Sequence, residues 1–216
     1  ARPEYTFVVG SPMAEVLSHY SEEINKCNIL QELNLTPGKY ILLSAHREEN
    51  IDNEINFRSL MNSVNSMAEK YDMPILYSCH PRAQKYIKER NFVFDNRVIQ
   101  HRPTGFFEYN KLQKNAFCVV SDSGTLPEES AYFGFPAVSI RTSTERPEAI
   151  DKGVFTIGTI SAEQVLQAVD LAVKMAYNGD NAASVPAYTE ENVSTKVVKI
   201  IQSYTGVVNK MVWRKY

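Results

Sequence analysis

The segment Ser123-Gly124-Thr125-Leu126-Pro127-Glu128-Glu129 has the residue types of a phosphate-binding turn. It follows the apolar run 116–120, which is typical of a buried strand, and it leads into residues that favour a helix. Backbone N–H groups and the positive end of the helix dipole would then face an anion. Glu129 follows one turn into the helix, where its carboxylate can accept hydrogen bonds from the vicinal hydroxyls of a sugar. Phosphate and ribose together indicate a nucleotide, although an ordinary strand-to-helix connection with an acidic first turn fits the same pattern.

Three other polar segments also come directly after a predicted strand. His46-Arg47-Glu48-Glu49-Asn50 follows the strand 40–44, His80-Pro81-Arg82 follows 74–78, and residues 141–146 follow 136–140. In an open α/β sheet, ligands bind beyond the carboxyl ends of the strands. Each segment alone has a structural explanation, such as a capped sheet, a solvated helix start or a surface ion pair. Together, the four turns predict a binding site along one rim of a sheet.

Strand-like and helix-like runs alternate along the whole chain. We predict strands at 5–9, 40–44, 74–78, 97–101, 117–121, 136–140 and 155–157. We predict helices at 12–27, 54–71, 83–90, 106–115, 126–133, 146–152, 162–177 and 190–204, with a loop at 178–186. This alternation predicts an α/β fold in which an open, parallel, Rossmann-like sheet carries helices on both faces.

Composition narrows the functional classes. The chain has 216 residues with 44% hydrophobic content, enough for one doubly wound unit, and its formal charge of −2 argues against a nucleic-acid partner. It shows neither a signal peptide nor a span of about 20 apolar residues, so we expect a cytoplasmic protein without a membrane partner. The four histidines lack the spacing of metal ligands, so we expect no metal site. Cys79 and Cys118 lie in apolar runs and are expected to be buried, reduced thiols.

With these motifs the sequence resembles the C-terminal half of the non-hydrolysing UDP-N-acetylglucosamine 2-epimerase family. The resemblance runs from about Thr6 to the C-terminus, and five motifs occur in the family's order and spacing. They are His46-Arg47, Asp122-Ser123-Gly124, Glu128-Glu129, Gly134-x-Pro136 and Thr144-Glu145-Arg146-Pro147-Glu148. The resemblance implies a glycosyltransferase-B arrangement, in which two Rossmann-like domains clamp a UDP-sugar. Residues 1–216 would be the C-terminal UDP-binding domain with its terminal helix, the N-terminal domain would be absent from this chain, and the intact protein would be a homodimer.

The resemblance also implies roles for individual residues. In the UDP site, Ser123, Gly124 and Thr125 would hold the diphosphate, Glu129 the ribose and Arg146 the phosphate side, with Tyr109 and Thr104 near the uracil.

Three further residues match positions near the sugar. His46 matches an active-site histidine that either assists proton transfer or orients the diphosphate. Arg47 and His80 match residues of a second UDP-sugar site, whose occupancy promotes domain closure in bacterial relatives. Glu48 changes the charge there, so we expect this regulation to be weakened.

The implied reaction inverts carbon 2 of a UDP-N-acetylhexosamine without a cofactor. UDP leaves carbon 1 as the carbon-2 proton is removed, and it adds back to the glycal after protonation from the opposite face. The carboxylates that handle this proton would lie in the missing half, so the isolated chain is expected to be inactive.

Two departures leave the hexose open between UDP-N-acetylglucosamine/mannosamine and a 6-deoxy-L-talose-configured precursor. Many relatives have Arg at the position of Glu48 and Gly at that of Thr125. The sequence of residues 44–50 and the C-terminal segment Val212-Trp213-Arg214-Lys215 resemble more closely the capsule and O-antigen branch of the family, which forms UDP-N-acetyl-L-fucosamine.

Two other functions remain open from the sequence. A glycosyltransferase of the same architecture also binds ribose through a Glu at a helix start, and an isolated half could be a non-catalytic nucleotide-binding module. The Thr-Glu-Arg-Pro-Glu segment and His46-Arg47 favour the epimerase.

Overall fold

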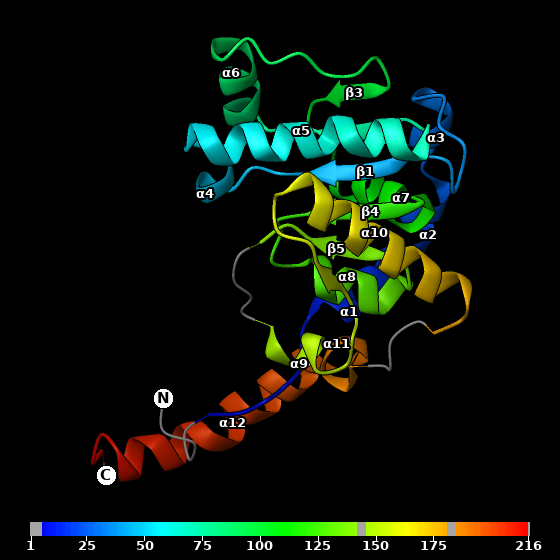
Figure 1. Ribbon diagram of the computed structural model, residues 1–216. Helices are drawn as coiled ribbons and strands as arrows, with labels where there is room; N and C mark the ends of the chain where they lie inside the picture. The colour runs from blue at the N-terminus through cyan, green and yellow to red at the C-terminus, as the bar shows by residue number, and fades with distance from the viewer. Residues whose placement is uncertain (1–5, 142–145, 181–184, 216) are drawn as a thin grey trace.

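The structure is a computed structural model that describes residues 6–141, 146–180 and 185–215 (Figure 1). Within these residues one parallel sheet is formed by β1 (Ile41–Ser44), β2 (Ile75–Ser78), β3 (Val98–His101), β4 (Cys118–Ser121), β5 (Ala137–Ser139) and β6 (Thr156–Ile157). The strands lie in the order β3-β2-β1-β4-β5-β6, and every pairing is parallel. This is the order of a doubly wound Rossmann-type sheet, so the predicted fold class is confirmed.

Helices cover both faces of this sheet because successive strand residues point to opposite sides. Ile41 and Leu43 join the core cluster beneath α5 (Glu54–Tyr71), α6 (Pro81–Glu89) and α10 (Ala162–Tyr177). Leu42 points to the other cluster, beneath α3 (Ile29–Glu32), α7 (Phe106–Asn115) and α8 (Leu126–Phe133). Cys79 and Cys118 are buried free thiols, as predicted.

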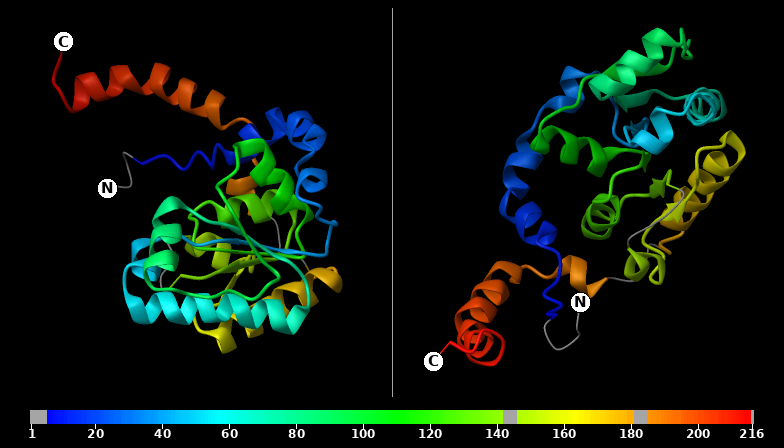
Figure 2. Two further views of the ribbon diagram at one scale, coloured as in Figure 1. Left: turned by 90° about the horizontal axis from the view of Figure 1, so that it is seen from above. Right: turned by 90° about the vertical axis from the view of Figure 1, so that its left-hand side faces the viewer.

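The remaining helices lie around this body and beyond it. They are α1 (Met13–His19), α2 (Ser21–Lys26), α4 (Glu48–Ile51), α9 (Pro147–Ile150), α11 (Pro186–Thr189) and α12 (Val193–Met211). Helix α12 projects away from the sheet as an arm, with the extended N-terminal segment beside it (Figure 2). Phe7 packs edge-on against Tyr204 at a ring-centroid distance of 5.0 Å. No helix among the described residues is long and apolar enough to cross a membrane.

The predicted bounds of α5, α7, α8 and α10 agree with the structure. Local signals set them: the Asn53 side chain accepts the N–H groups of Ile55 and Asn56 at the start of α5, and Gly134, at φ 75°, ends α8 in the left-handed conformation. Three short helices, α3, α4 and α11, were missed because four residues carry little periodicity.

Two predicted elements were wrong in part. Of the predicted strand 5–9, Tyr5 lies outside the described residues, and residues 6–9 pair with no described strand. Val8 is 91% exposed, so β-type residues alone did not make a strand there. The predicted helix 12–27 is divided at Tyr20, which leaves helical geometry at φ −99° and ψ 16° and packs against Phe107. Tertiary packing therefore overrides the helical periodicity.

Candidate functional site

The predicted rim lies where β1 and β4 run side by side. Ser44 and Ser121 are register partners at the carboxyl ends of these strands, and His46 and Ser123 follow each of them by two residues. From β1 the chain continues into helices on one face of the sheet, whereas β4 leads into α8 on the other face. The two turns therefore face each other at the topological switch point, where Rossmann-type sheets hold their ligands.

Asp122 joins the two turns across this point. Its side chain is fully buried, and its Oδ2 accepts the backbone N–H groups of His46 and Arg47, each at 2.9 Å. The Arg47 Nε also donates to the backbone carbonyl of Asp122 at 2.8 Å. Sequence reasoning included Asp122 in a motif but gave it no role, because its partners are about 75 residues away.

The turn after β4 is organised by its own hydroxyl groups. Ser123 donates its N–H to Ser121 Oγ at 3.0 Å, and its own Oγ lies 3.0 Å from Thr125 Oγ1. Gly124 is open: a Cβ placed there would meet no atom within 4 Å. Since Thr125 is the N-cap of α8, the turn places the helix start at the rim, as a phosphate-binding turn requires.

Glu129 lies buried one turn below, with 7% of its surface exposed. Thr125 Oγ1 donates to its Oε1 at 3.0 Å, and Gln113 Nε2 donates to its Oε2 at 2.5 Å. Burial raises the pKa of Glu129, and these two hydrogen bonds oppose that rise. Thr125 thus links the turn directly to the carboxylate predicted to hold ribose, a link that Gly could not make. Gln113, supplied by α7, carried no signal in the sequence.

The structure places Tyr109 beneath the same point. Burial and then the charge of Glu129 raise the pKa of its hydroxyl, whereas the Ser44 and Ser121 side chains beside it oppose that rise. Thr104 lies half-buried in the loop between β3 and α7, and its buried hydroxyl has no hydrogen-bond partner among the described residues. A buried hydroxyl without a partner is costly unless a ligand pairs with it.

Arg146 comes to the site through an ion pair. Its guanidinium lies 3.2 Å from Glu128 Oε1, and only 5% of Glu128 is exposed. The adjacent Thr144 and Glu145 lie outside the described residues. The pair places a cation beside Glu128, in the first turn of α8. The two adjacent glutamates therefore have different roles: Glu128 pairs with Arg146, and Glu129 bonds to Thr125 of the turn.

A second group of polar residues lies beside His46. An open cavity of about 470 Å³ is lined by His46, Arg47, Glu48, Glu49, His80 and Arg82. The His46 and His80 rings are 6.0 Å apart. Arg82 donates to Glu48 at 2.6 Å and also to Asp52, and these hydrogen bonds raise the pKa of Arg82. Its charge is therefore already compensated by two carboxylates.

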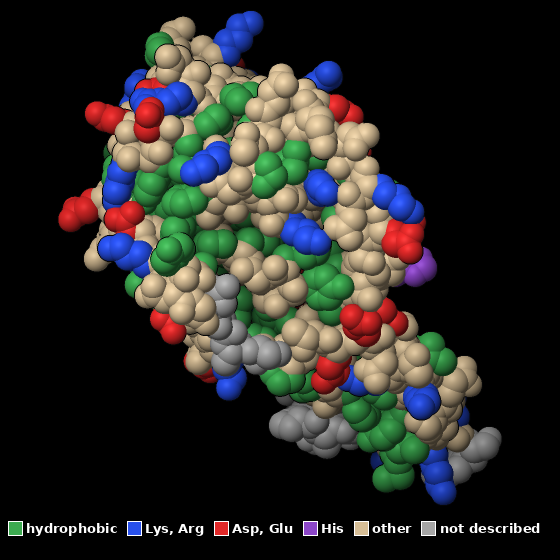
Figure 3. All heavy atoms as spheres, turned by 90° about the vertical axis from the view of Figure 1, so that its right-hand side faces the viewer, with side chains coloured by type: hydrophobic (Ala, Val, Ile, Leu, Met, Phe, Trp, Pro, Cys, Tyr) green, Lys and Arg blue, Asp and Glu red, His purple; other side chains and the backbone are tan. Residues whose placement is uncertain are grey.

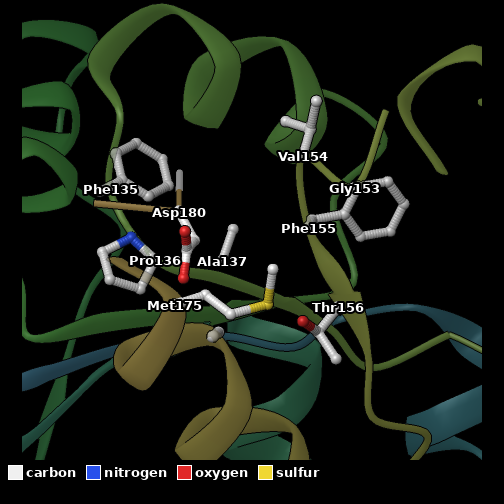
Figure 4. Close-up of a pocket in the computed structure, with 10 residues that line it drawn as sticks. Phe135, Pro136, Ala137, Gly153, Val154, Phe155, Thr156, Met175 and Asp180 are labelled. Atoms are coloured by element: carbon white, nitrogen blue, oxygen red, sulfur yellow. The ribbon is translucent and has the colours of Figure 1, made fainter. Parts of the chain in front are cut away.

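A different pocket lies away from the rim (Figure 4). Its walls include Phe135 and Pro136, which precede β5, and Val154 and Phe155, which precede β6. It sits at the amino ends of the strands and has a volume of about 30 Å³, the space of one water molecule. It is too small for a nucleotide. Among the described residues, no group of three or more His, Cys, Asp or Glu side chains gathers as metal ligands would.

The chain is similar in sequence to a known family of enzymes. A family model described as UDP-N-acetylglucosamine 2-epimerase matches residues 1–202. The UDP-N-acetylglucosamine 2-epimerase of Methanocaldococcus jannaschii is 34% identical over 147 residues, which are 66% of this chain and 40% of that protein.

Solved structures show the same similarity. The UDP-N-acetylglucosamine 2-epimerase of Rickettsia bellii superposes with a TM-score of 0.85 at 36% identity, covering 96% of this chain and 56% of that one. The M. jannaschii UDP-GlcNAc 2-epimerase, solved with UDP-GlcNAc and UDP, gives 0.82 at 26% identity, covering 94% and 56%. The chain therefore spans about half the length of the proteins it matches.

Proposed function

The chain belongs to the UDP-N-acetylglucosamine 2-epimerase family, and from this premise we propose that it is the C-terminal, UDP-binding half of a UDP-sugar 2-epimerase. The hydrogen-bonded series Ser123, Thr125 and Glu129 carries the proposal, because it joins an open helix start to a buried carboxylate at the switch point. A diphosphate at the turn and a ribose at Glu129 match these two groups in charge and in hydrogen-bonding chemistry. The match to an epimerase family favours this function over the sugar-transferase alternative.

The residues of this chain would act on the leaving group. In the proposed reaction the bond from carbon 1 to the UDP oxygen breaks as the carbon-2 proton is lost, so negative charge develops on the diphosphate. N–H groups at the start of α8 and the cation of Arg146 stabilise that charge. In this proposal Thr104 and Tyr109 lie near the uracil base. His46 lies across the switch point from the turn that begins at Ser123.

The exposed surface of helix α12 supports the proposal that a second domain packs against this chain. Apolar side chains gather along the arm that it forms (Figure 3). Val198, Ile201 and Met211 are 58%, 55% and 71% exposed. Exposed apolar patches of this kind mark surfaces that bind another protein or a membrane. We assign this surface to the N-terminal domain of the same protein, which would carry the proton-transfer carboxylates, and we keep a homodimer as the proposed assembly.

We expect the isolated chain to bind UDP without epimerising any UDP-N-acetylhexosamine. Isothermal titration with UDP measures the first property, and NMR of UDP-N-acetylglucosamine incubated with the chain measures the second. Gly124→Ala is the matched variant: its added methyl would meet no protein atom within 4 Å, so the melting temperature should not change, whereas a bound diphosphate would meet it.

UDP affinity should therefore fall in Gly124→Ala at unchanged stability. Equal UDP affinity in the two proteins would move the diphosphate away from the turn. Robust turnover by the 216-residue chain would instead refute the assignment of the proton-transfer groups to another domain.

We propose that the sugar is an N-acetylhexosamine. The finer proposal is that the substrate is the 6-deoxy-L-talose-configured precursor of UDP-N-acetyl-L-fucosamine, and that the product is used in the synthesis of surface polysaccharide. The sequence of residues 44–50 and the end 212–215 motivate the finer proposal, whereas Glu48 and Thr125, the two departures from many relatives, leave the hexose open. Assays of the two-domain protein with both substrate classes would decide between them, since only one should be inverted at carbon 2 at a useful rate.

The pairing of Arg82 supports a weakened second UDP-sugar site around Arg47 and His80. With Glu48 and Asp52 bound to Arg82, the cavity offers an anionic ligand less free positive charge. We expect the initial rate of the two-domain protein to depend hyperbolically on substrate concentration. A sigmoidal dependence that becomes hyperbolic in Arg47→Ala would show that the second site still drives closure.

A further inference from the structure

The two oxygens of the Asp122 carboxylate are in different situations. Oδ2 accepts three donors: the backbone N–H groups of His46 and Arg47 and the side-chain Nδ2 of Asn50, the last at 3.2 Å. Oδ1 is buried and has no hydrogen bond of good geometry among the described residues. Nδ1 of His46 lies 3.3 Å from Oδ1.

This arrangement restricts the proton of the His46 ring. A buried carboxylate oxygen without a donor is costly, and a ring nitrogen that presents its lone pair to that oxygen is repelled. Placing the proton on Nδ1 removes the repulsion and brings a donor to 3.3 Å from Oδ1, where a small rotation of the ring would align it. The bond made by one imidazole nitrogen decides which tautomer the ring adopts.

We infer that Asp122 is a positioning residue that holds the His46 ring in the Nδ1–H tautomer and so leaves Nε2 as the proton acceptor. The His46 side chain is 46% exposed, so the ring is accessible from the rim while Asp122 is not. If the proposed function holds, Nε2 would accept a proton at the switch point, and the ring that becomes charged would lie against the Asp122 carboxylate. The tautomer itself can be measured without any turnover.

Nitrogen NMR of the ¹⁵N-histidine-labelled chain tests the inference at about pH 8.5, well above the ordinary histidine pKa. His46 should show a protonated Nδ1 and an unprotonated Nε2, and His46→Gln assigns its signals by their loss. Two other rings provide internal standards. His80 Nδ1 accepts the Arg82 N–H at 3.3 Å, so His80 should show the opposite tautomer. His101 Nδ1 lies 2.6 Å from the Arg102 carbonyl and should share the His46 tautomer.

Asp122→Asn is the decisive variant. Its amide oxygen can keep the Oδ2 contacts, and its NH₂ group then donates to His46 Nδ1, so the tautomer should invert to Nε2–H. In the two-domain protein kcat should fall about 100-fold with little change in KM. An Nε2–H tautomer in the wild-type chain, or an unchanged Nδ1–H tautomer in Asp122→Asn, would overturn the inference. A fall in kcat of Asp122→Asn without a change of tautomer would also overturn it. If the predicted tautomers are found but the two-domain protein shows no turnover, only the proposed function is contradicted.

A pair of His46 variants provides an independent check if Asp122→Asn does not fold. His46→Asn places an amide N–H where Nδ1–H stood, whereas His46→Leu supplies no donor, and both keep the backbone bond to Oδ2. His46→Asn should melt near the wild-type temperature and His46→Leu about 2–4 °C lower. Equal melting temperatures in these two variants would contradict a donor role for Nδ1.

Discussion

Glu129→Ala should weaken UDP binding to this chain by about 1–3 kcal/mol, roughly 5- to 150-fold, in isothermal titration. The carboxylate is buried beside the turn, and hydrogen bonds from ribose hydroxyls to an ionised acceptor are of the stronger, charge-assisted kind. The variant also leaves the donors on Gln113 and Thr125 without their acceptor, so its stability should fall as well.

Glu129→Gln separates binding from stability. It keeps the shape and an acceptor oxygen but removes the charge. Burial raises the folded-state pKa of Glu129 above its ordinary value of 4.5. The wild-type chain therefore loses stability as pH rises through the window above 4.5, where only the unfolded state ionises. Glu129→Gln should therefore melt higher than wild type at pH 7 and show no such gain below about pH 4.

The exposed Glu69, near the end of α5, provides the matched control. Glu69→Gln should leave UDP affinity unchanged. If Glu129→Gln and Glu129→Ala both bind UDP as wild type does, Glu129 does not contact the nucleotide. If they bind weakly and Glu129→Gln shows no pH-dependent stability gain, the carboxylate is not held in the buried state described above.

Arg146→Ala should lower kcat of the two-domain protein by about 10²–10³-fold, comparable to the loss of one preorganised group that stabilises transition-state charge. The cation lies beside the start of α8, where charge on the leaving diphosphate would develop. Initial rates across substrate concentrations would show the loss in kcat more than in KM, because the charge grows as the bond to carbon 1 breaks.

Removing Arg146 also leaves the buried Glu128 without this partner, so a fold defect must be separated from a catalytic one. The double variant Arg146→Ala/Glu128→Gln removes the ion pair as a unit and should recover the melting temperature but not the rate. Arg146→Lys keeps the charge but loses the planar, five-donor geometry, and it should recover only part of the rate. Full recovery of kcat in the double variant would show that Arg146 acts through the fold and not on the diphosphate.

Local sequence determined the fold class and most of the elements. Alternating apolar runs and helical periods set the strands and long helices, and caps such as Asn53 and Gly134 set their ends. The sequence also located the rim, because each polar turn follows a strand and parallel strands end on the same edge. These signals are carried by neighbouring residues, so no tertiary contact is needed to detect them.

The tertiary structure decided which of these groups meet and in what state. Asp122 bonds to His46 and Arg47 across two different strands, and Gln113 reaches Glu129 from another helix. Glu48, which the sequence marked only as a charge reversal, is an ion-pair partner of Arg82. Tertiary packing also explains why residues 6–9 of the predicted strand 5–9 pair with no described strand and why the predicted helix 12–27 is divided at Tyr20. Hydrogen bonds between distant segments, and the burial that sets the pKa of Glu129, depend on where the chain folds back on itself, and no local pattern encodes that.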